Sequence, residues 1–87
     1  MQQQRLPEVY ILLNLESKLI SQKYYKDNPG SFKSIIKTEA KFLIDKKIKQ
    51  INSIEKNKKN VHLINIINDE IKTIKHAETE IINRWNS

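Results

Sequence analysis

Apolar residues recur along most of the chain at steps of three and four, and two polar clusters interrupt them. The clusters are residues 27–31 (Asp-Asn-Pro-Gly-Ser) and residues 57–60 (Asn-Lys-Lys-Asn). A 3.6-residue period predicts amphipathic helices, and clusters of this composition predict turns. The pattern therefore predicts an all-α fold with three helices, at about residues 7–25, 30–56 and 60–85.

The first segment is apolar nearly all round, which is typical of a helix that is buried on several sides or lies at an interface. Pro7 suits the first turn of a helix, because backbone N–H groups there have no partner within the helix and proline has no N–H. Residues 9–13 (Val-Tyr-Ile-Leu-Leu) leave a short β-strand as the alternative, because a short apolar run fits either structure.

The second and third segments each carry a regular apolar stripe. In the second, the stripe contains Phe32, Ile35, Ile36, Ala40, Leu43, Ile44, Ile48, Ile51 and Ile54. In the third, it forms a heptad seam, interrupted by the charged Glu78, that contains Ile64, Ile67, Ile71, Ile74, Ile81 and Trp85. A heptad seam is typical of a helix–helix interface.

Three helices with short connections predict an up-down-up arrangement, with one shorter N-terminal helix and two long antiparallel helices. Asn28 or Ser31 is the expected N-cap of the second helix, and Asn60 of the third. The chain is long enough for one domain, residues 1–87, with a modest core. Because these three helices cannot bury all of their apolar surface against one another, we expect a homo-oligomer that associates through the heptad seam or the first helix. A monomeric three-helix bundle is the alternative.

Composition narrows the class of protein. The absence of cysteine excludes disulfides and thiolate metal sites. The chain has 14 lysines, 15 isoleucines and 9 asparagines, residues with AT-rich codons that are common in phages and mobile elements but also in ordinary bacterial genomes. No signal peptide or membrane-spanning stretch is apparent, so we expect a soluble, cytoplasmic protein without membrane contact.

The net charge of +6 is concentrated in residues 31–59, where nine lysines face three acidic residues. Lys33, Lys37 and Lys41 are four residues apart and form one row along the predicted helix. Such a row attracts an anionic partner, either an acidic protein surface or nucleic acid. The presence of only two arginines argues against base-specific recognition. The alternative is a solvated lysine face without a ligand.

An aromatic, basic stretch precedes the second segment. Tyr24 and Tyr25 lie between two lysines, so a ligand could stack on a tyrosine while Lys26 balances its charge. Ser31 and Lys33 follow in the first helical turn, where free N–H groups favour an anion. The sequence therefore predicts a ligand or anion site here. The alternative is that the tyrosines cover the end of the core with their hydroxyls in water.

No catalytic constellation is recognisable. His76 and Glu80 share a helix face with Asp69 two turns earlier, but this spacing matches no known metal motif. The serines have no histidine at helical spacing, and the single glycine excludes a glycine-rich phosphate loop. We therefore expect no enzyme, no metal and no cofactor. Trp85 is expected to anchor the packing.

These observations favour a non-catalytic helical binding protein, an inhibitor or adaptor from a phage or mobile element. Its basic second segment would meet an acidic protein surface or a nucleic-acid-associated protein. One alternative is a nucleotide or nucleic-acid binder, including an oligomeric sponge that sequesters a nucleotide signal. Another alternative is a purely structural helical assembly protein.

Overall fold

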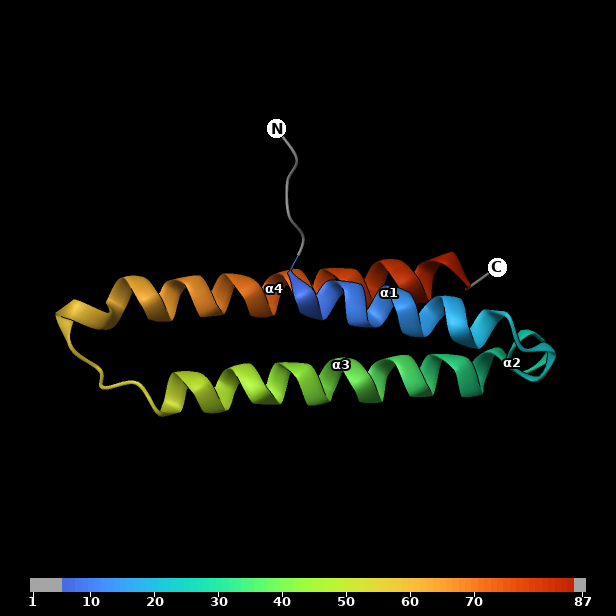
Figure 1. Cartoon of the computed structure of the whole chain (residues 1–87), viewed down its shortest axis with the longest axis horizontal. Coiled ribbons are helices and arrows are strands. Elements are labelled where there is room, and N and C mark those ends of the chain that lie inside the picture. Colours follow the sequence, from blue (N-terminus) through green and yellow to red (C-terminus); the bar gives the residue numbers. More distant parts are fainter. Residues whose placement is uncertain (1–5, 86–87) are drawn as a thin grey trace, which may run out of the picture.

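The computed structural model describes residues 6–85, and this part of the chain is all-helical (Figure 1). Its α-helices are α1 (Pro7–Ile20), α2 (Lys23–Asp27), α3 (Pro29–Asn52) and α4 (Val61–Arg84), with a 3₁₀ turn, η1 (Lys58–Asn60), before α4. The long helices α3 and α4 have 24 residues each, or about 36 Å at 1.5 Å per residue. The prediction of an all-α fold is confirmed, with four α-helices over the described residues where three were expected.

The first helix is shorter than predicted because the chain turns after Ile20. The Ser21 hydroxyl donates a hydrogen bond to the Lys18 carbonyl at 2.7 Å, and Gln22 adopts an extended conformation with φ −101° and ψ 125°. The predicted helix over residues 7–25 is therefore wrong at its C-terminal end, where α2 forms separately. Pro7 stands in the first turn of α1 as predicted, and residues 9–13 are helical, so the strand alternative is wrong.

Asparagine side chains close the loops of this chain and do not cap its long helices. Asn28 precedes α3, but its amide donates to the Tyr24 carbonyl at 2.7 Å, which closes α2. Asn60 precedes α4, and its amide donates to the Glu55 carbonyl at 2.7 Å. Asn57 accepts from the Asn60 backbone N–H at 3.1 Å. The predicted N-cap hydrogen bonds are therefore absent at both helices.

The two long helices lie side by side and run in opposite directions, and α1 lies along only part of their length (Figure 1). With 14 residues, α1 is about 21 Å long, and Figure 1 shows it beginning near the middle of the long helices and ending beside α2. The core lies where the three helices meet and contains Val9, Leu12, Leu19, Phe32, Ile36, Ala40, Leu43, Ile74, Ala77 and Ile81.

Burial follows α1. Every buried residue of α3 precedes Ile44, and every buried residue of α4 follows Ile66. Beyond the beginning of α1, the long helices pack on each other and on the loop between them, with no third α-helix beside them among the described residues. The structure therefore has a well-packed three-helix end, and a two-helix end that terminates in the loop before α4.

The substitution Ile74→Ala is expected to lower the free energy of unfolding by about 2–5 kcal/mol, because it leaves a cavity at a fully buried position. Ile11→Ala is the matched control. Its side chain is exposed on α1, so we expect a loss below about 1 kcal/mol. Urea unfolding followed by circular dichroism measures both. Similar losses at the two positions would contradict this placement of the core.

Candidate functional site

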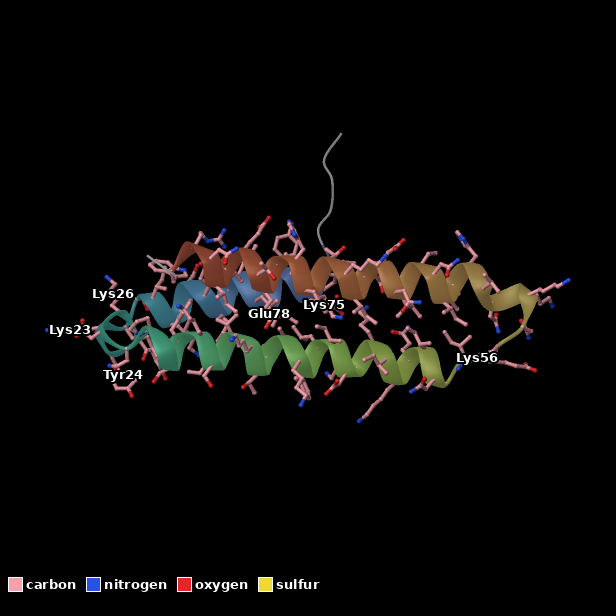
Figure 2. The ribbon with its side chains drawn as sticks, turned by 180° about the vertical axis from the view of Figure 1, so that it is seen from behind. Lys23, Tyr24, Lys26, Lys56, Lys75 and Glu78 are labelled. Carbon is pink, nitrogen blue, oxygen red and sulfur yellow. The ribbon has the colours of Figure 1, made fainter. Side chains whose placement is uncertain are left out.

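The residues predicted to bind an anion lie in different parts of the structure. Tyr24, Tyr25 and Lys26 belong to α2, and Figure 2 shows Tyr24 and Lys26 at the three-helix end. Lys37 and Lys41 are exposed further along α3, while Ser31 and Lys33 are half-buried near its beginning. The structure therefore separates a candidate site at α2 from a candidate surface on α3.

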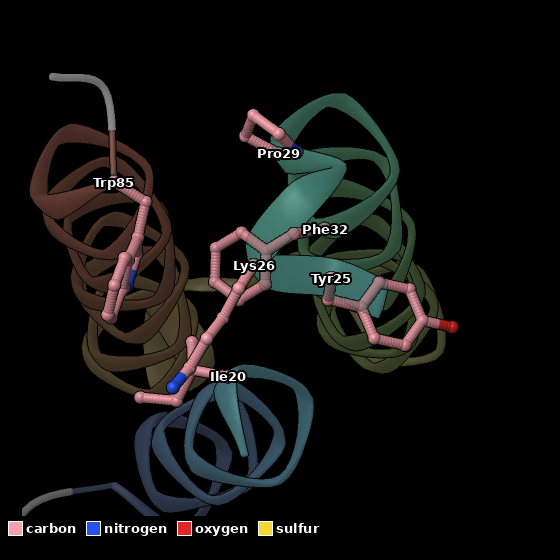
Figure 3. A pocket seen from close by; sticks show the side chains of 6 residues that line it. All are labelled: Ile20, Tyr25, Lys26, Pro29, Phe32 and Trp85. Carbon is pink, nitrogen blue, oxygen red and sulfur yellow. The ribbon is translucent and has the colours of Figure 1, made fainter. Parts of the chain in front are cut away.

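A cavity of about 240 Å³ opens at the three-helix end, between α2, the beginning of α3 and the end of α4 (Figure 3). Aromatic rings make up much of its wall: Phe32 and Trp85 meet edge-on, with their centroids 5.8 Å apart. The side chain of Lys26 extends across it toward Ile20, as Figure 3 shows. The lining residues are Ile20, Tyr25, Lys26, Pro29, Phe32 and Trp85.

Of the α2 residues predicted to hold a ligand, only Tyr25 and Lys26 line this cavity. Tyr24 is exposed, and its ring meets that of Tyr25 edge-on at 5.0 Å. The partial burial of Tyr25 against the core agrees with a covering role for this ring.

A buried carboxylate beside the cavity connects α1 to the end of α4. Glu16 is only 7% exposed and accepts two hydrogen bonds from Arg84, through Nε and Nη2, both at 3.0 Å. The Trp85 indole N–H donates to the same carboxylate at 2.6 Å. Two parallel hydrogen bonds between a guanidinium and a carboxylate are among the stronger polar contacts in proteins. We call Glu16, Arg84 and Trp85 the Glu16 cluster.

The Glu16 cluster keeps its carboxylate ionised. Burial alone would raise the pKa of Glu16, but the hydrogen bonds from Arg84 and Trp85 and the positive charge of Arg84 outweigh it, so this pKa lies below its ordinary value. The hydrogen bond to Glu16 in turn raises the pKa of Arg84. Both partners stay charged at neutral pH, and the contact anchors α1 instead of offering a titrating group to a ligand.

A second charge network fastens the other end of α1. Lys47 of α3 lies between two carboxylates, 3.3 Å from Glu8 of α1 and 3.0 Å from Glu70 of α4. Burial would lower the pKa of Lys47, but its hydrogen bonds to Glu70 and Glu8 raise it. One lysine of the basic segment is therefore committed to the fold. The Oε1 atom of Glu8 is buried and accepts no hydrogen bond from the described residues.

The surface of α3 turned away from the core is basic, with an aromatic ring in its midst. We call it the outer face of α3, and its residues are Lys37, Lys41, Phe42, Asp45, Lys46 and Lys49. Phe42 is 53% exposed, and the Lys46 amino group lies 4.7 Å from its ring centroid. A shallow hollow beside the ring is lined by Phe42, Asp45, Lys46, Ile48 and Lys49.

The apolar pattern gave no reason to single out Phe42. The one available signal was an aromatic residue off the apolar stripe of its helix, directly after Lys41. Burying an exposed phenylalanine ring against a partner removes apolar surface from water, which is favourable. Phe42 is therefore the strongest candidate contact on the outer face.

The predicted oligomer seam is largely occupied within one chain. Its residues Ile67, Ile71, Ile74 and Ile81 are buried, Ile64 is half-buried, and Trp85 belongs to the Glu16 cluster. Of the seam residues, only Trp85 is among the exposed large apolar side chains; the others are Tyr10, Ile11, Tyr24, Phe42, Ile48, Val61, Leu63 and Ile66. Any surface for a second copy therefore has to be sought among these.

The remaining polar candidates form ordinary surface contacts. His76 Nε2 lies 2.7 Å from Glu80 Oε1 on the exposed side of α4. Within residues 6–85, no three histidine or acidic side chains gather in a way that could hold a metal ion. In the same range, no helix is both long enough and apolar enough to cross a membrane.

Replacing Glu16 by glutamine is expected to lower the free energy of unfolding at pH 7 by about 1–3 kcal/mol, because charge-assisted hydrogen bonds are lost at a buried position. The pKa of Glu16 is lowered by folding, so its contribution is fully present above the unfolded value near 4.5 and disappears as pH falls through the folded pKa. The difference between wild type and variant should therefore be constant near neutral pH and shrink in acid.

Urea unfolding over a series of pH values measures this difference. Glu80→Gln is the control, since its exposed pair with His76 is expected to contribute less than about 1 kcal/mol. A difference between wild type and Glu16→Gln that did not change in acid would contradict the assignment.

Comparison with known proteins brings no relative to this site. No family model matches the chain. No curated protein and no solved structure matches it either. The interpretation of the cavity and of the outer face of α3 therefore depends on their own geometry and charge.

Proposed function

We propose that this chain is a non-catalytic binding protein and that the outer face of α3 docks on an acidic surface of a partner protein. The observation that carries the proposal is Phe42, which is more than half exposed and has the Lys46 amino group 4.7 Å from its ring centroid. Four lysines and one aspartate give this face a charge of +3 by count (4 − 1).

An apolar centre within a charged rim is the usual composition of a protein–protein interface. Aromatic side chains near the centre contribute most of the binding free energy when they become buried. Lysines at the rim increase the rate of encounter with an acidic partner and discriminate against basic ones. Phe42 and its neighbours Lys41 and Lys46 supply both parts on one rigid helix.

Nucleic acid fits the same face less well. Arginine is the residue that favours bidentate phosphate contacts. Arg84 lies on α4, away from the outer face of α3, and is already hydrogen-bonded to Glu16 of α1. An acidic protein surface is therefore the preferred partner, and a role as inhibitor or adaptor agrees with a small domain that presents one preformed helix.

The end cavity supports a second candidate function, the binding of a small aromatic anion such as a nucleotide. The rings of Trp85 and Tyr25 offer apolar surface, and Lys26 supplies a positive charge. The Trp85 N–H is already bonded to Glu16, so the indole would contribute its ring and not a hydrogen bond. This candidate retains the nucleotide alternative, at Tyr25 and Lys26 but not along the lysine row.

Affinity capture from host extract tests the first candidate. We expect a protein that is retained by the wild-type chain and lost from Phe42→Ala and from Lys41→Glu, because the first removes the apolar centre and the second reverses a rim charge. The loss is expected to be at least tenfold, about 1.4 kcal/mol. Quantitative mass spectrometry of the captured proteins gives the ratio.

Lys72→Glu is the matched control. Lys72 is an exposed lysine on α4, so its reversal changes the net charge equally but leaves the outer face of α3 intact. Equal loss with Lys72→Glu would indicate attraction by net charge alone. Retention of a labelled DNA duplex by the wild type, with no protein retained, would contradict the choice of partner.

Tryptophan fluorescence tests the second candidate, because Trp85 is the only tryptophan and lines the cavity. Titration with adenosine monophosphate is expected to change the emission in a saturable way, and Lys26→Glu is expected to weaken binding at least tenfold. Lys23→Glu, an exposed lysine of α2 outside the cavity lining, should bind as the wild type does. A linear change that is equal in all three proteins would rule the cavity out as a site for this ligand.

A further inference from the structure

The two-helix end carries apolar side chains that the described chain covers only in part. Leu63 is 45% exposed and Ile66 is 42% exposed on α4. Ile51 of α3 and Ile54, which follows it in the loop, are only half-buried. We call these four residues the uncovered strip.

The ion-pair network around Lys47 places the uncovered strip in line with α1. Glu70 and Lys47 lie at the beginning of α1, because both belong to the network with Glu8. Ile66 and Leu63 precede Glu70 by four and seven residues and therefore lie on its side of α4. Ile51 follows Lys47 by four residues on α3 in the same way. A longer α1 would thus have packed on the uncovered strip.

We propose that the uncovered strip is a homodimer interface, in which two copies pack their two-helix ends against each other about a twofold axis. Each copy then replaces the missing half of the other's α1 with its own α3 and α4. The centre of the dimer becomes a four-helix bundle, flanked at both ends by the three-helix packing of each chain.

A second copy fits this surface because the contact needs only one patch. In a twofold dimer each copy contributes the same patch. The uncovered strip is aliphatic, so it can pack against the identical strip of a second copy. Nine residues of α4 (61–69) and five of α3 (48–52) extend past the beginning of α1, or roughly 14 Å and 8 Å. Because the two copies are identical, their antiparallel ends match in length.

The charges that would meet in this arrangement are opposite. An antiparallel dimer brings the loop of one copy to the beginning of α1 in the other. The loop carries Lys56, Lys58 and Lys59 against Glu55, and Figure 2 shows Lys56 at the end of the molecule opposite α2. At the other side of the contact, Glu8 and Glu70 outnumber Lys47. Attraction between these groups favours the antiparallel orientation.

Sedimentation equilibrium tests the dimer. We expect the wild type to approach twice the chain mass of 10.3 kDa at micromolar to submillimolar concentration. Ile66→Asp should raise the dissociation constant by roughly 100-fold or more, because the twofold axis brings the carboxylate into the apolar contact twice. Its monomer should keep the wild-type circular dichroism, since the side chain is exposed in a single chain.

Val61→Asp is the matched control. Val61 is 52% exposed on α4, but it precedes Ile66 by five residues, about 140° around the helix, and faces away from the uncovered strip. It should dimerise as the wild type does. A monomeric wild type, or a dimer that Ile66→Asp leaves intact, would overturn the proposal.

Single-cysteine variants test the orientation, because the chain has no cysteine of its own. Ile66 lies near the middle of the uncovered strip and therefore near the proposed twofold axis. Ile66→Cys is expected to form an interchain disulfide on mild oxidation, at least tenfold faster than Val61→Cys. Equal rates for the two variants would contradict the antiparallel dimer.

Discussion

The carboxylate of Glu16 holds together a fold whose first helix, α1, could not persist alone. A helix of 14 residues is marginal in water, so α1 depends on its contacts with the long helices. Glu16 bonds it to Arg84 and Trp85 at one end, and Lys47 bonds it to α3 and α4 at the other. These contacts determine where the core ends, where Trp85 stands in the cavity wall, and which part of the long helices stays uncovered.

Most of the helical content of this fold can be predicted from the 3.6-residue period, and the buried side chains Ile36, Ile74 and Ile81 lie on the predicted stripes. The end of α1 could not be predicted, because Tyr24 and Tyr25 continue a helical pattern through the turn at Gln22. Nor could the Glu16 cluster, since a glutamate in an apolar helix resembles any exposed charge until Arg84, 68 residues later, is placed beside it. Periodicity identifies faces and does not pair them.

The same limit explains the outcome for the candidate sites. Lysine spacing correctly marks a basic helix, but it does not distinguish Lys47, which lies between two carboxylates, from Lys41, which faces solvent. The structure shows that the lysine row and the aromatic turn belong to different surfaces. It also shows that Ile74 and Ile81 of the heptad seam pack in the core of a single chain, against α1 and α3. These two residues are therefore not available to a second copy.

The long sequence distance inside the Glu16 cluster has a consequence for how the protein forms during synthesis. Helix α1 leaves the ribosome first, yet its anchoring partners at residues 84 and 85 emerge only after α4 has been made. The apolar side of α1 therefore stays unpacked until the hairpin of α3 and α4 has assembled from local contacts. During that interval the nascent chain exposes its most hydrophobic segment, and this is the period in which chaperones or premature association would act on it.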